Sequence, residues 1–250
     1  MDKMINKGIK VDAIITDPPY GTTSCKWDAV IPFDKMWERL KQIRNDNTPI
    51  ILFGSEPFSS FLRTSNIKEY KYDWKWDKVT GTGHLCSKFQ PMQRIEDIIV
   101  FSKTKNTYNP IMIELDEKEY KKKLAKISKK DSYVSNSELT NERKELSIRD
   151  RDISKYKFAY PNNLLTYSKY LAECNNVNRS HPTQKPLILM EYLINTYTNE
   201  NDLVLDFTCG SGSTLVAAKN LNRRCIGIEL DDKYCEISKN RIQKHTICSA

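Results

Sequence analysis

One stretch near the C-terminus decides the fold: Leu203-Val204-Leu205-Asp206-Phe207-Thr208-Cys209-Gly210-Ser211-Gly212. Its apolar residues stop at an acidic residue, and a loop with two glycines follows. We predict a helix over residues 212–222, a second strand over 224–229 and a second helix over 232–245. Strands that alternate with helices in this way lie parallel in one sheet, with right-handed crossovers. The sequence therefore predicts an α/β fold.

The same alternation extends to the rest of the chain. Short apolar runs that end at Gly or at polar residues predict strands, and apolar residues at helical spacing predict helices. We therefore expect a mostly parallel sheet of about seven strands, with helices on both faces. The further strands are predicted over residues 10–16, 49–54, 70–76, 95–101 and 163–167, and the further helices over residues 33–45, 57–65 and 187–198.

A charged segment interrupts this pattern. Residues 114–157 are dominated by Lys, Glu, Asp, Arg and Ser, with few apolar side chains. Such a composition cannot supply a large core. We expect a mainly helical insertion of 114–157 outside a core made of residues 1–113 and 158–250, a size that suits one large α/β domain.

The composition of the chain argues against membrane-spanning, secreted and zinc-binding proteins. No apolar run reaches the roughly 18 residues of a membrane span, and the first residues lack the apolar stretch of a signal peptide, so we expect a soluble, cytoplasmic protein. The seven cysteines form no C-x-x-C pair and have no zinc spacing with the three histidines, which predicts free thiols and no metal. A net charge of +8 suits a phosphate backbone but does not by itself identify a partner.

The Gly210-Ser211-Gly212 loop indicates a ligand site, because ligands of open α/β sheets bind beyond the carboxyl ends of the strands. Position 215 is Leu, so the G-x-G-x-x-G dinucleotide pattern is incomplete. Glu229 ends the next predicted strand, about 20 residues on, where a carboxylate meets ribose hydroxyls. Asp206 suits a cationic group such as an α-amino group. A ribose at one end and an amino-acid group at the other describe S-adenosylmethionine (SAM); a plain strand–helix turn is the alternative.

Asp17-Pro18-Pro19-Tyr20 follows the first predicted strand. Two consecutive prolines fix φ and remove two backbone donors, so nearby acceptors are held rigidly. The Asp17 carboxylate and the Pro18 carbonyl could accept both N–H groups of a nucleobase amine and free its lone pair to attack a methyl group. Tyr20 could stack on a base flipped from the duplex. The alternative is a simple turn with a packed aromatic residue.

Taken together, these motifs resemble the amino-methylating DNA methyltransferases, which methylate adenine N6 or cytosine N4. Their order, with the catalytic loop first and the SAM loop last, resembles the permuted β subgroup. The resemblance covers nearly the whole chain. It rests on Thr16-Asp17-Pro18-Pro19-Tyr20-Gly21, Gly81-Thr82-Gly83, residues 94–101, Tyr108-Asn109-Pro110, His181-Pro182-Thr183-Gln184-Lys185-Pro186 and residues 206–214.

The resemblance implies a Rossmann-like fold, SAM as cofactor, double-stranded DNA as partner and a target-recognition role for residues 114–157. It also implies catalytic and cofactor-side residues. Relatives commonly begin about one strand earlier, which leads to the hypothesis that a shorter N-terminus weakens SAM binding. The implied catalytic residues are Asp17, Pro18, Pro19 and Tyr20; the implied cofactor-side residues are Thr183, Gln184, Lys185, Pro186, Asp206, Phe207, Thr208, Gly210, Ser211, Gly212, Thr214 and Glu229.

The target base is the least determined feature. No Pro-Cys dipeptide occurs, which disfavours cytosine-C5 chemistry, and an acidic first residue in the tetrapeptide resembles adenine enzymes more than cytosine-N4 enzymes. We therefore expect adenine, with cytosine N4 as the alternative. A DNA-binding relative with weak catalysis is a second alternative, and an RNA methyltransferase is a third. A homodimer and a cognate restriction nuclease both remain open as partners.

Overall fold

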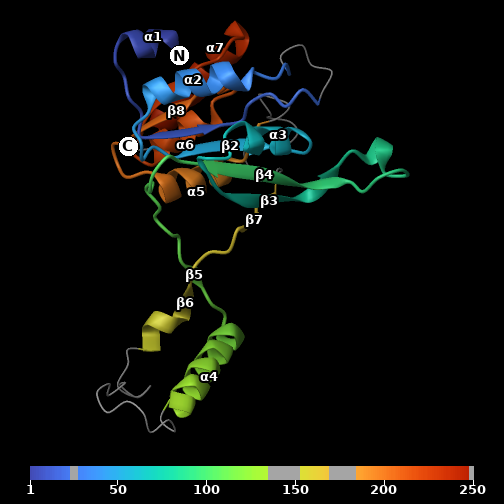
Figure 1. Cartoon of the computed structure of the whole chain (residues 1–250), viewed down its shortest axis with the longest axis vertical. Coiled ribbons are helices and arrows are strands. Elements are labelled where there is room, and N and C mark those ends of the chain that lie inside the picture. Colours follow the sequence, from blue (N-terminus) through green and yellow to red (C-terminus); the bar gives the residue numbers. More distant parts are fainter. Residues whose placement is uncertain (23–27, 135–152, 169–183, 248–250) are drawn as a thin grey trace. The chain divides into compact units, whose positions relative to one another are not determined.

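The computed structural model describes residues 1–22, 28–134, 153–168 and 184–247. The chain divides into two compact units, residues 1–109 with 163–250 and residues 110–162. The first unit contains a seven-stranded sheet of order β7-β3-β4-β2-β1-β8-β9 (Figure 1). The strands are β1 (Ala13–Thr16), β2 (Ile50–Gly54), β3 (Tyr70–Thr82), β4 (Gln93–Phe101), β7 (Leu164–Thr166), β8 (Leu203–Asp206) and β9 (Arg224–Gly227).

The sheet is mostly parallel, as the sequence predicts. β1 pairs in parallel with β2 and β8, β8 with β9, and β3 with β7. Only β4 runs antiparallel to its neighbours, β2 and β3. β1 and β2 are buried along their whole length, which explains why their sequences are continuous apolar runs rather than alternating ones.

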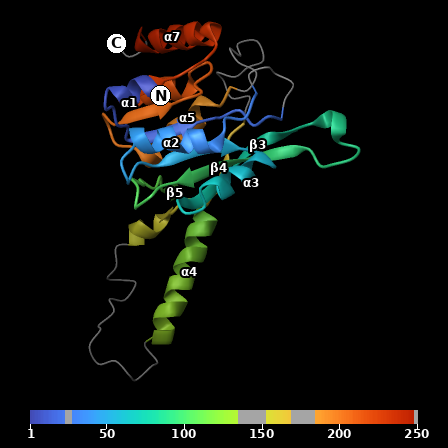
Figure 2. The same ribbon diagram turned by 45° about the horizontal axis from the view of Figure 1, so that its top comes forward.

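Helices cover both faces of the sheet. Successive strand residues point to opposite faces, so Ile14 packs in one core layer and Ile15 in the other. The Ile14 layer includes α1 (Asp2–Asn6), α2 (Phe33–Ile43) and α3 (Phe58–Ser65), whereas the Ile15 layer includes α5 (Leu187–Tyr197) and α6 (Ser213–Asn220). Figures 1 and 2 show α2 and α5 on opposite sides of the sheet. The last helix, α7 (Asp232–Ile247), follows β9.

Helix α5 illustrates how the sequence directs this packing. It begins directly after Pro186, whose extended backbone precedes the first helical turn. Its buried residues lie on the face that meets the sheet, and Leu193 is fully buried. Burial of a leucine of this kind contributes about 1.5–3 kcal/mol. Helix α5 therefore fixes the position of the residues immediately before it, including Lys185.

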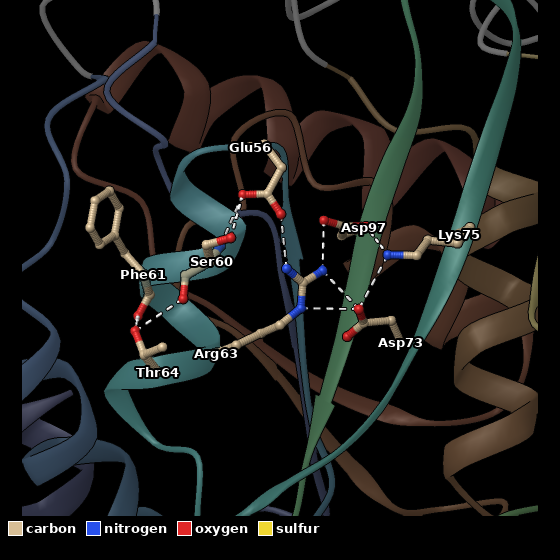
Figure 3. A network of polar contacts seen from close by, with 8 residues as sticks. All are labelled: Glu56, Ser60, Phe61, Arg63, Thr64, Asp73, Lys75 and Asp97. Carbon is tan, nitrogen blue, oxygen red and sulfur yellow. Dashed lines mark hydrogen bonds and ion pairs between the residues drawn. The ribbon is translucent and has the colours of Figure 1, made fainter.

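Helix α3 is held against the sheet by an ion-pair network around Arg63 (Figure 3). Its guanidinium Nη2 lies 2.7 Å from Asp73 Oδ2 and 2.8 Å from Asp97 Oδ2, while Nη1 lies 3.0 Å from Glu56 Oε1. Asp73 and Asp97 come from the neighbouring strands β3 and β4, and each side chain is only 10% exposed. Because unpaired carboxylates at such burial are costly, Arg63 stabilises the packing of α3 on both strands.

Strands β3 and β4 continue beyond the predicted ranges 70–76 and 95–101. β3 reaches Thr82 and β4 starts at Gln93, and a turn containing the short helix η1 (His84–Cys86) joins them. The β-branched residues Thr80 and Thr82 favour this extension. We call residues 78–94 the β3–β4 arm. Figure 1 shows it extending past the helices that cover the sheet.

The second unit is small. It contains a two-stranded sheet of β5 (Ile113–Glu114) and β6 (Phe158–Ala159), the helix α4 (Glu117–Val134) and the short helix η3 (Ile153–Lys157). Helix α4 agrees with the helical character expected of the charged insertion. The role of this unit in target recognition stays a prediction.

In the described part of the chain, no helix has the length and apolarity needed to cross a membrane. Within the same residues, no group of His, Cys, Asp and Glu side chains is arranged to hold a metal ion. Four cysteines lie in the described ranges, and all four are free thiols: Cys86, Cys209, Cys225 and Cys235.

Candidate active site

The two loops that the sequence singles out meet in space. β1 and β8 are neighbouring parallel strands, with Ala13 opposite Val204 and Ile14 opposite Leu205. Their carboxyl ends therefore lie at the same edge of the sheet. A hydrogen bond crosses from one loop to the other, because Thr208 Oγ1 donates to the Asp17 carbonyl over 3.0 Å. The two loops therefore lie side by side in the structure.

The buried Asp206 carboxylate links the two loops through hydrogen bonds. It is 4% exposed, and its Oδ1 accepts from Thr16 Oγ1 at 2.5 Å and from the Thr208 backbone N–H at 3.2 Å. Its Oδ2 accepts from Thr214 Oγ1 at 2.5 Å. Both oxygens are thus occupied by this chain's own donors, so Asp206 acts here as a buried clamp between β1 and the start of α6. Its predicted approach to a ligand's amino group stays a prediction.

Burial raises the pKa of the Asp206 carboxyl to about 6, although the hydroxyl and backbone donors oppose the rise. The cause is desolvation, since a buried carboxylate loses hydration that neutral hydroxyls replace only in part. No described cation lies within ion-pair distance of Asp206. The site therefore contains an acidic group that is close to half-ionised at mildly acidic pH.

The Gly loop is a tightly constrained turn. Gly210 and Gly212 have φ values of +50° and +82°, a backbone region that residues other than Gly rarely adopt. A Cβ at Gly212 would also lie 2.6 Å from Ser238 Oγ of α7. Arg241 from the same helix donates to the Ser211 carbonyl at 2.6 Å. Two separate requirements, backbone conformation and close packing, thus select Gly at position 212.

Glu229 closes the other side of this loop. Its Oε2 accepts from the Gly210 backbone N–H at 2.7 Å, and its Oε1 accepts from the N–H groups of Leu230 and Asp231 at 2.8 and 3.0 Å. The carboxylate therefore lies beside the Gly loop, as the spacing predicts. A carboxylate has about four lone-pair positions, so these three bonds leave room for one further donor.

Four further residues were expected on the cofactor side: Phe207, Gln184, Pro186 and Thr183. Phe207 is 5% exposed and packs in the core, so only its backbone faces the loop. Gln184 meets the Gly loop through its Oε1, which accepts from Ser211 Oγ at 3.3 Å. Pro186 precedes α5 and is buried. Thr183 lies outside the described residues.

The Asp17 carboxylate is the centre of the second loop. Its side chain is 23% exposed, and it accepts from Tyr20 OH at Oδ1 and from Lys185 Nζ at Oδ2, both at 2.5 Å. The Tyr20 ring stacks on Phe58 of α3, with centroids 5.1 Å apart and planes at 28°. Among the described residues, no donor reaches the Pro18 carbonyl. The Asp17 carboxylate therefore stands next to the carbonyl of Pro18, a residue that is itself buried.

Lys185 binds Asp17, and its expected place on the cofactor side stays a prediction. Besides its bond to Asp17, its Nζ lies 3.4 Å from Glu96 Oε2. It also lies 5.0 Å from the ring centroid of Phe53 and 5.8 Å from that of Trp76. Cations are attracted to aromatic faces at such distances. The ammonium group is therefore enclosed by two carboxylates and aromatic rings at the reaction side of the site.

Glu96 was not identified from the sequence, because its partners are distant along the chain. Its Oε1 binds Lys78 Nζ at 3.0 Å, and its other oxygen faces Lys185. The recognisable signal was the pair Glu96-Asp97 inside an otherwise apolar strand, since mid-strand acids need partners. Lys78, Glu96, Lys185 and Asp17 form one chain of alternating charges.

This chain of charges sets the protonation of the site. Burial raises the pKa of the Asp17 carboxyl, Glu96 raises it further, and Lys185 opposes both. Burial acts to lower the pKa of Lys185, but the carboxylates of Asp17 and Glu96 outweigh it and hold that pKa above its ordinary value. Lys185 therefore stays charged, and it is the cation that favours the ionised form of Asp17. Tyr20 remains protonated, because burial and the nearby acids raise the pKa of its phenol far above the usual range.

The chain is similar in sequence to two named methyltransferases. The type II methyltransferase M.HpaI of Haemophilus parainfluenzae is 28% identical over 247 residues, which cover 93% of this chain and 68% of the relative. The type II methyltransferase M1.MboII of Moraxella bovis is 27% identical over 254 residues, or 94% of this chain and 89% of the relative.

Solved structures share the fold. The M1.HpyAVI–SAM complex has a TM-score of 0.59 at 24% identity and covers 96% of this chain and 93% of its own. The cytosine-N4-specific PvuII DNA methyltransferase has a TM-score of 0.58 at 18% identity and covers 96% and 86%. The Rossmann-like fold class is thereby confirmed.

A protein-family model described as DNA methylase, N6_N4_Mtase, matches residues 11–240. The match contains the Asp17 loop, Lys185 and the Gly loop, which are the parts that the structure brings together. The chain therefore belongs to the N6_N4_Mtase family of DNA methylases.

Proposed function

We propose that this DNA methylase transfers a methyl group from SAM to the N6 amine of an adenine that has left the duplex. One observation supports the proposal most directly. The Asp17 carboxylate and the Pro18 carbonyl stand at the end of β1, beside the Gly loop at the end of β8. An acceptor pair for an amine thus adjoins a loop suited to a nucleoside.

The residues at the end of β8 fit SAM. Glu229 retains one lone-pair position for a ribose hydroxyl after its three backbone bonds. Gly210 and Gly212 present backbone without side chains, which permits close approach. We propose that Glu229, the Gly loop and Gln184 hold the cofactor. Bound SAM supplies the methyl group.

On the side of the base, Asp17 and Pro18 accept the two N–H groups of the adenine amine. These bonds would draw the nitrogen toward tetrahedral geometry. Its lone pair would then form the new N–C bond as the methyl–sulfur bond of the cofactor breaks and a neutral thioether leaves. The methylated amine is then cationic and loses one proton, for which the Asp17 carboxylate is the nearest acceptor. Acceptors that are already oriented stabilise the developing charge without rearrangement. Lys185 positions Asp17, and Tyr20 and Phe58 offer an aromatic wall.

Adenine is favoured over cytosine by the acidic residue at position 17. A carboxylate accepts a proton more readily than a neutral side chain does, which suits the proton loss just described. We also propose the permuted β subgroup, double-stranded DNA as substrate and target recognition by residues 114–157. A cognate restriction nuclease is proposed because two relatives are named type II methyltransferases.

The test is a methylation assay with labelled SAM and unmethylated plasmid DNA, followed by digestion and chromatography of the nucleosides. We expect N6-methyladenine. Asp17→Ala should lower the rate by about 100- to 1000-fold, the usual effect of losing one oriented polar group. Asp46→Ala, which removes an exposed carboxylate from a surface ion pair, is the matched control and should retain full activity. Methylcytosine without methyladenine would contradict the choice of base.

A further inference from the structure

The β3–β4 arm carries apolar side chains that nothing in the described chain covers. Phe89 is 89% exposed and Leu85 is 85% exposed, and both lie in the turn that joins the two strands. Met92 nearby is 47% exposed. An exposed apolar cluster of this kind marks an interaction surface more often than a chance feature.

The arm is also one-sided in charge. Residues 78–95 contain no Asp or Glu, although acidic residues number 32 in the 250-residue chain. The same segment contains the exposed Lys88 and Arg94, and Lys78, which is buried against Glu96. Arg94 binds Asp77 but remains 52% exposed. A basic, acid-free segment with an aromatic tip complements a polyanion that can also stack on rings, and nucleic acid has both properties.

The root of the arm is joined to the reaction site. Lys78, the first residue of the arm, binds Glu96, and Glu96 faces Lys185, which binds Asp17. Through these ion pairs, Glu96 and Lys185 connect the start of the arm to the Asp17 carboxylate. A duplex whose adenine reaches Asp17 lies next to this root.

The backbone of the arm departs from regular strand geometry. Val79 has a φ of +68°, which is a real outlier for a β-branched residue, and its N–H is fixed by Asp77 Oδ1 at 2.8 Å. The strand register shifts between Asp77 and Thr82, and irregularities of this type redirect strands next to functional sites. A Cβ at Gly81 would lie 2.8 Å from Met92 Cβ, so the two strands of the arm are packed closely. Strain of this kind persists where it serves a function.

We infer that the β3–β4 arm enters the target duplex and that Phe89, supported by Leu85, fills the space left by the extruded base. This inference rests on the proposed function. Extrusion leaves a gap in the base stack, and apolar side chains can occupy such a gap between base steps. Lys88 and Arg94 pair with phosphates on either side of it. The arm thus assists extrusion, while residues 114–157 are left with sequence recognition.

The experiment first takes the target sequence from single-molecule sequencing of DNA from cells that express the chain. A duplex with 2-aminopurine at the target position then reports extrusion as increased fluorescence. We expect Phe89→Ala to reduce the extruded fraction by about tenfold to a hundredfold, the range for loss of one aromatic–base stack. Phe61→Ala removes an exposed Phe from α3, where it is 63% exposed, and should leave the signal unchanged. Phe89→Trp should retain extrusion.

A second duplex separates this inference from the proposed function. It places the target adenine opposite an abasic site, where the base is already unpaired. The parent should methylate both duplexes, and Phe89→Ala should be slow only on the paired one. If the parent methylates neither duplex, the proposed function itself fails. If the parent is active and Phe89→Ala matches it on both duplexes, the arm does not fill the gap. A change in oligomeric state of Phe89→Ala, with normal extrusion, would assign the tip to a second copy of the chain instead.

Discussion

The buried Asp206 carboxylate leads to a sharp prediction about stability. Its pKa rises from an ordinary 3.8 to about 6 in the folded chain. The folded state therefore binds more protons than the unfolded state between these two values, and stability falls as the pH rises through this window. Each pKa unit is worth about 1.4 kcal/mol, so the ionised carboxylate costs the fold about 3 kcal/mol at pH 7. Asp206→Asn keeps the shape and removes the charge.

We expect the free energy of unfolding of Asp206→Asn, relative to the parent, to increase by about 2 kcal/mol between pH 4 and pH 7. Hydrogen bonds to Thr16 and Thr214 add a constant offset, because hydroxyls can donate or accept. Urea unfolding of both proteins at several pH values measures the difference. The exposed Asp46→Asn is the control and should show no trend. A difference between Asp206→Asn and the parent that is flat from pH 4 to pH 7 would refute the reasoning.

Two further predictions concern the site. Lys185→Met removes the cation that opposes the raised pKa of Asp17, so the acid limb of the methylation rate should move to higher pH, whereas Lys185→Arg should keep the profile of the parent; superimposable profiles would contradict this. Gly212→Ala forces a side chain into a left-handed conformation and toward Ser238, and should destabilise the fold by about 2–4 kcal/mol in urea unfolding. Adding Ser238→Ala should recover part of that loss, and no recovery would exclude the steric contribution.

The central sheet could be predicted because local and global signals agree there. Strand β8 ends at Asp206, and strand β1 ends at Thr16, directly before Asp17. Both strands end where the apolar run in the sequence stops. Buried parallel strands need apolar residues on both faces, so their limits are visible in the sequence. The helices predicted over residues 33–45 and 187–198 begin at Phe33 and Leu187, where the apolar spacing begins. The pairing of β1 with β8, in contrast, is seen only in the structure.

The charge chain could not be predicted, because its members come from separate elements. Glu96 lies 89 positions before Lys185 in the numbering, and only the packing of β4 beside the start of α5 brings them together. Lys185 stood out through a family motif, which suggested a place at the cofactor rather than at Asp17. The length of the β3–β4 arm was also missed, since Gly81 and Gly83 are typical of turns. Gly81 instead allows close contact with Met92.

Asp17 and Asp206 follow neighbouring strands, yet they meet different partners. Burial raises the pKa of both carboxyl groups, and the charge of Asp17 raises the pKa of Asp206 further. Only Asp17 has a cation, Lys185, within ion-pair distance, whereas Asp206 is bound by neutral hydroxyls and a backbone N–H. Adjacent carboxylates in unlike environments commonly take separate roles. A carboxylate whose charge is stabilised by a lysine can accept from an amine, and one enclosed by hydroxyls can join two strands. The division of roles at this junction therefore follows from which partners each strand end meets.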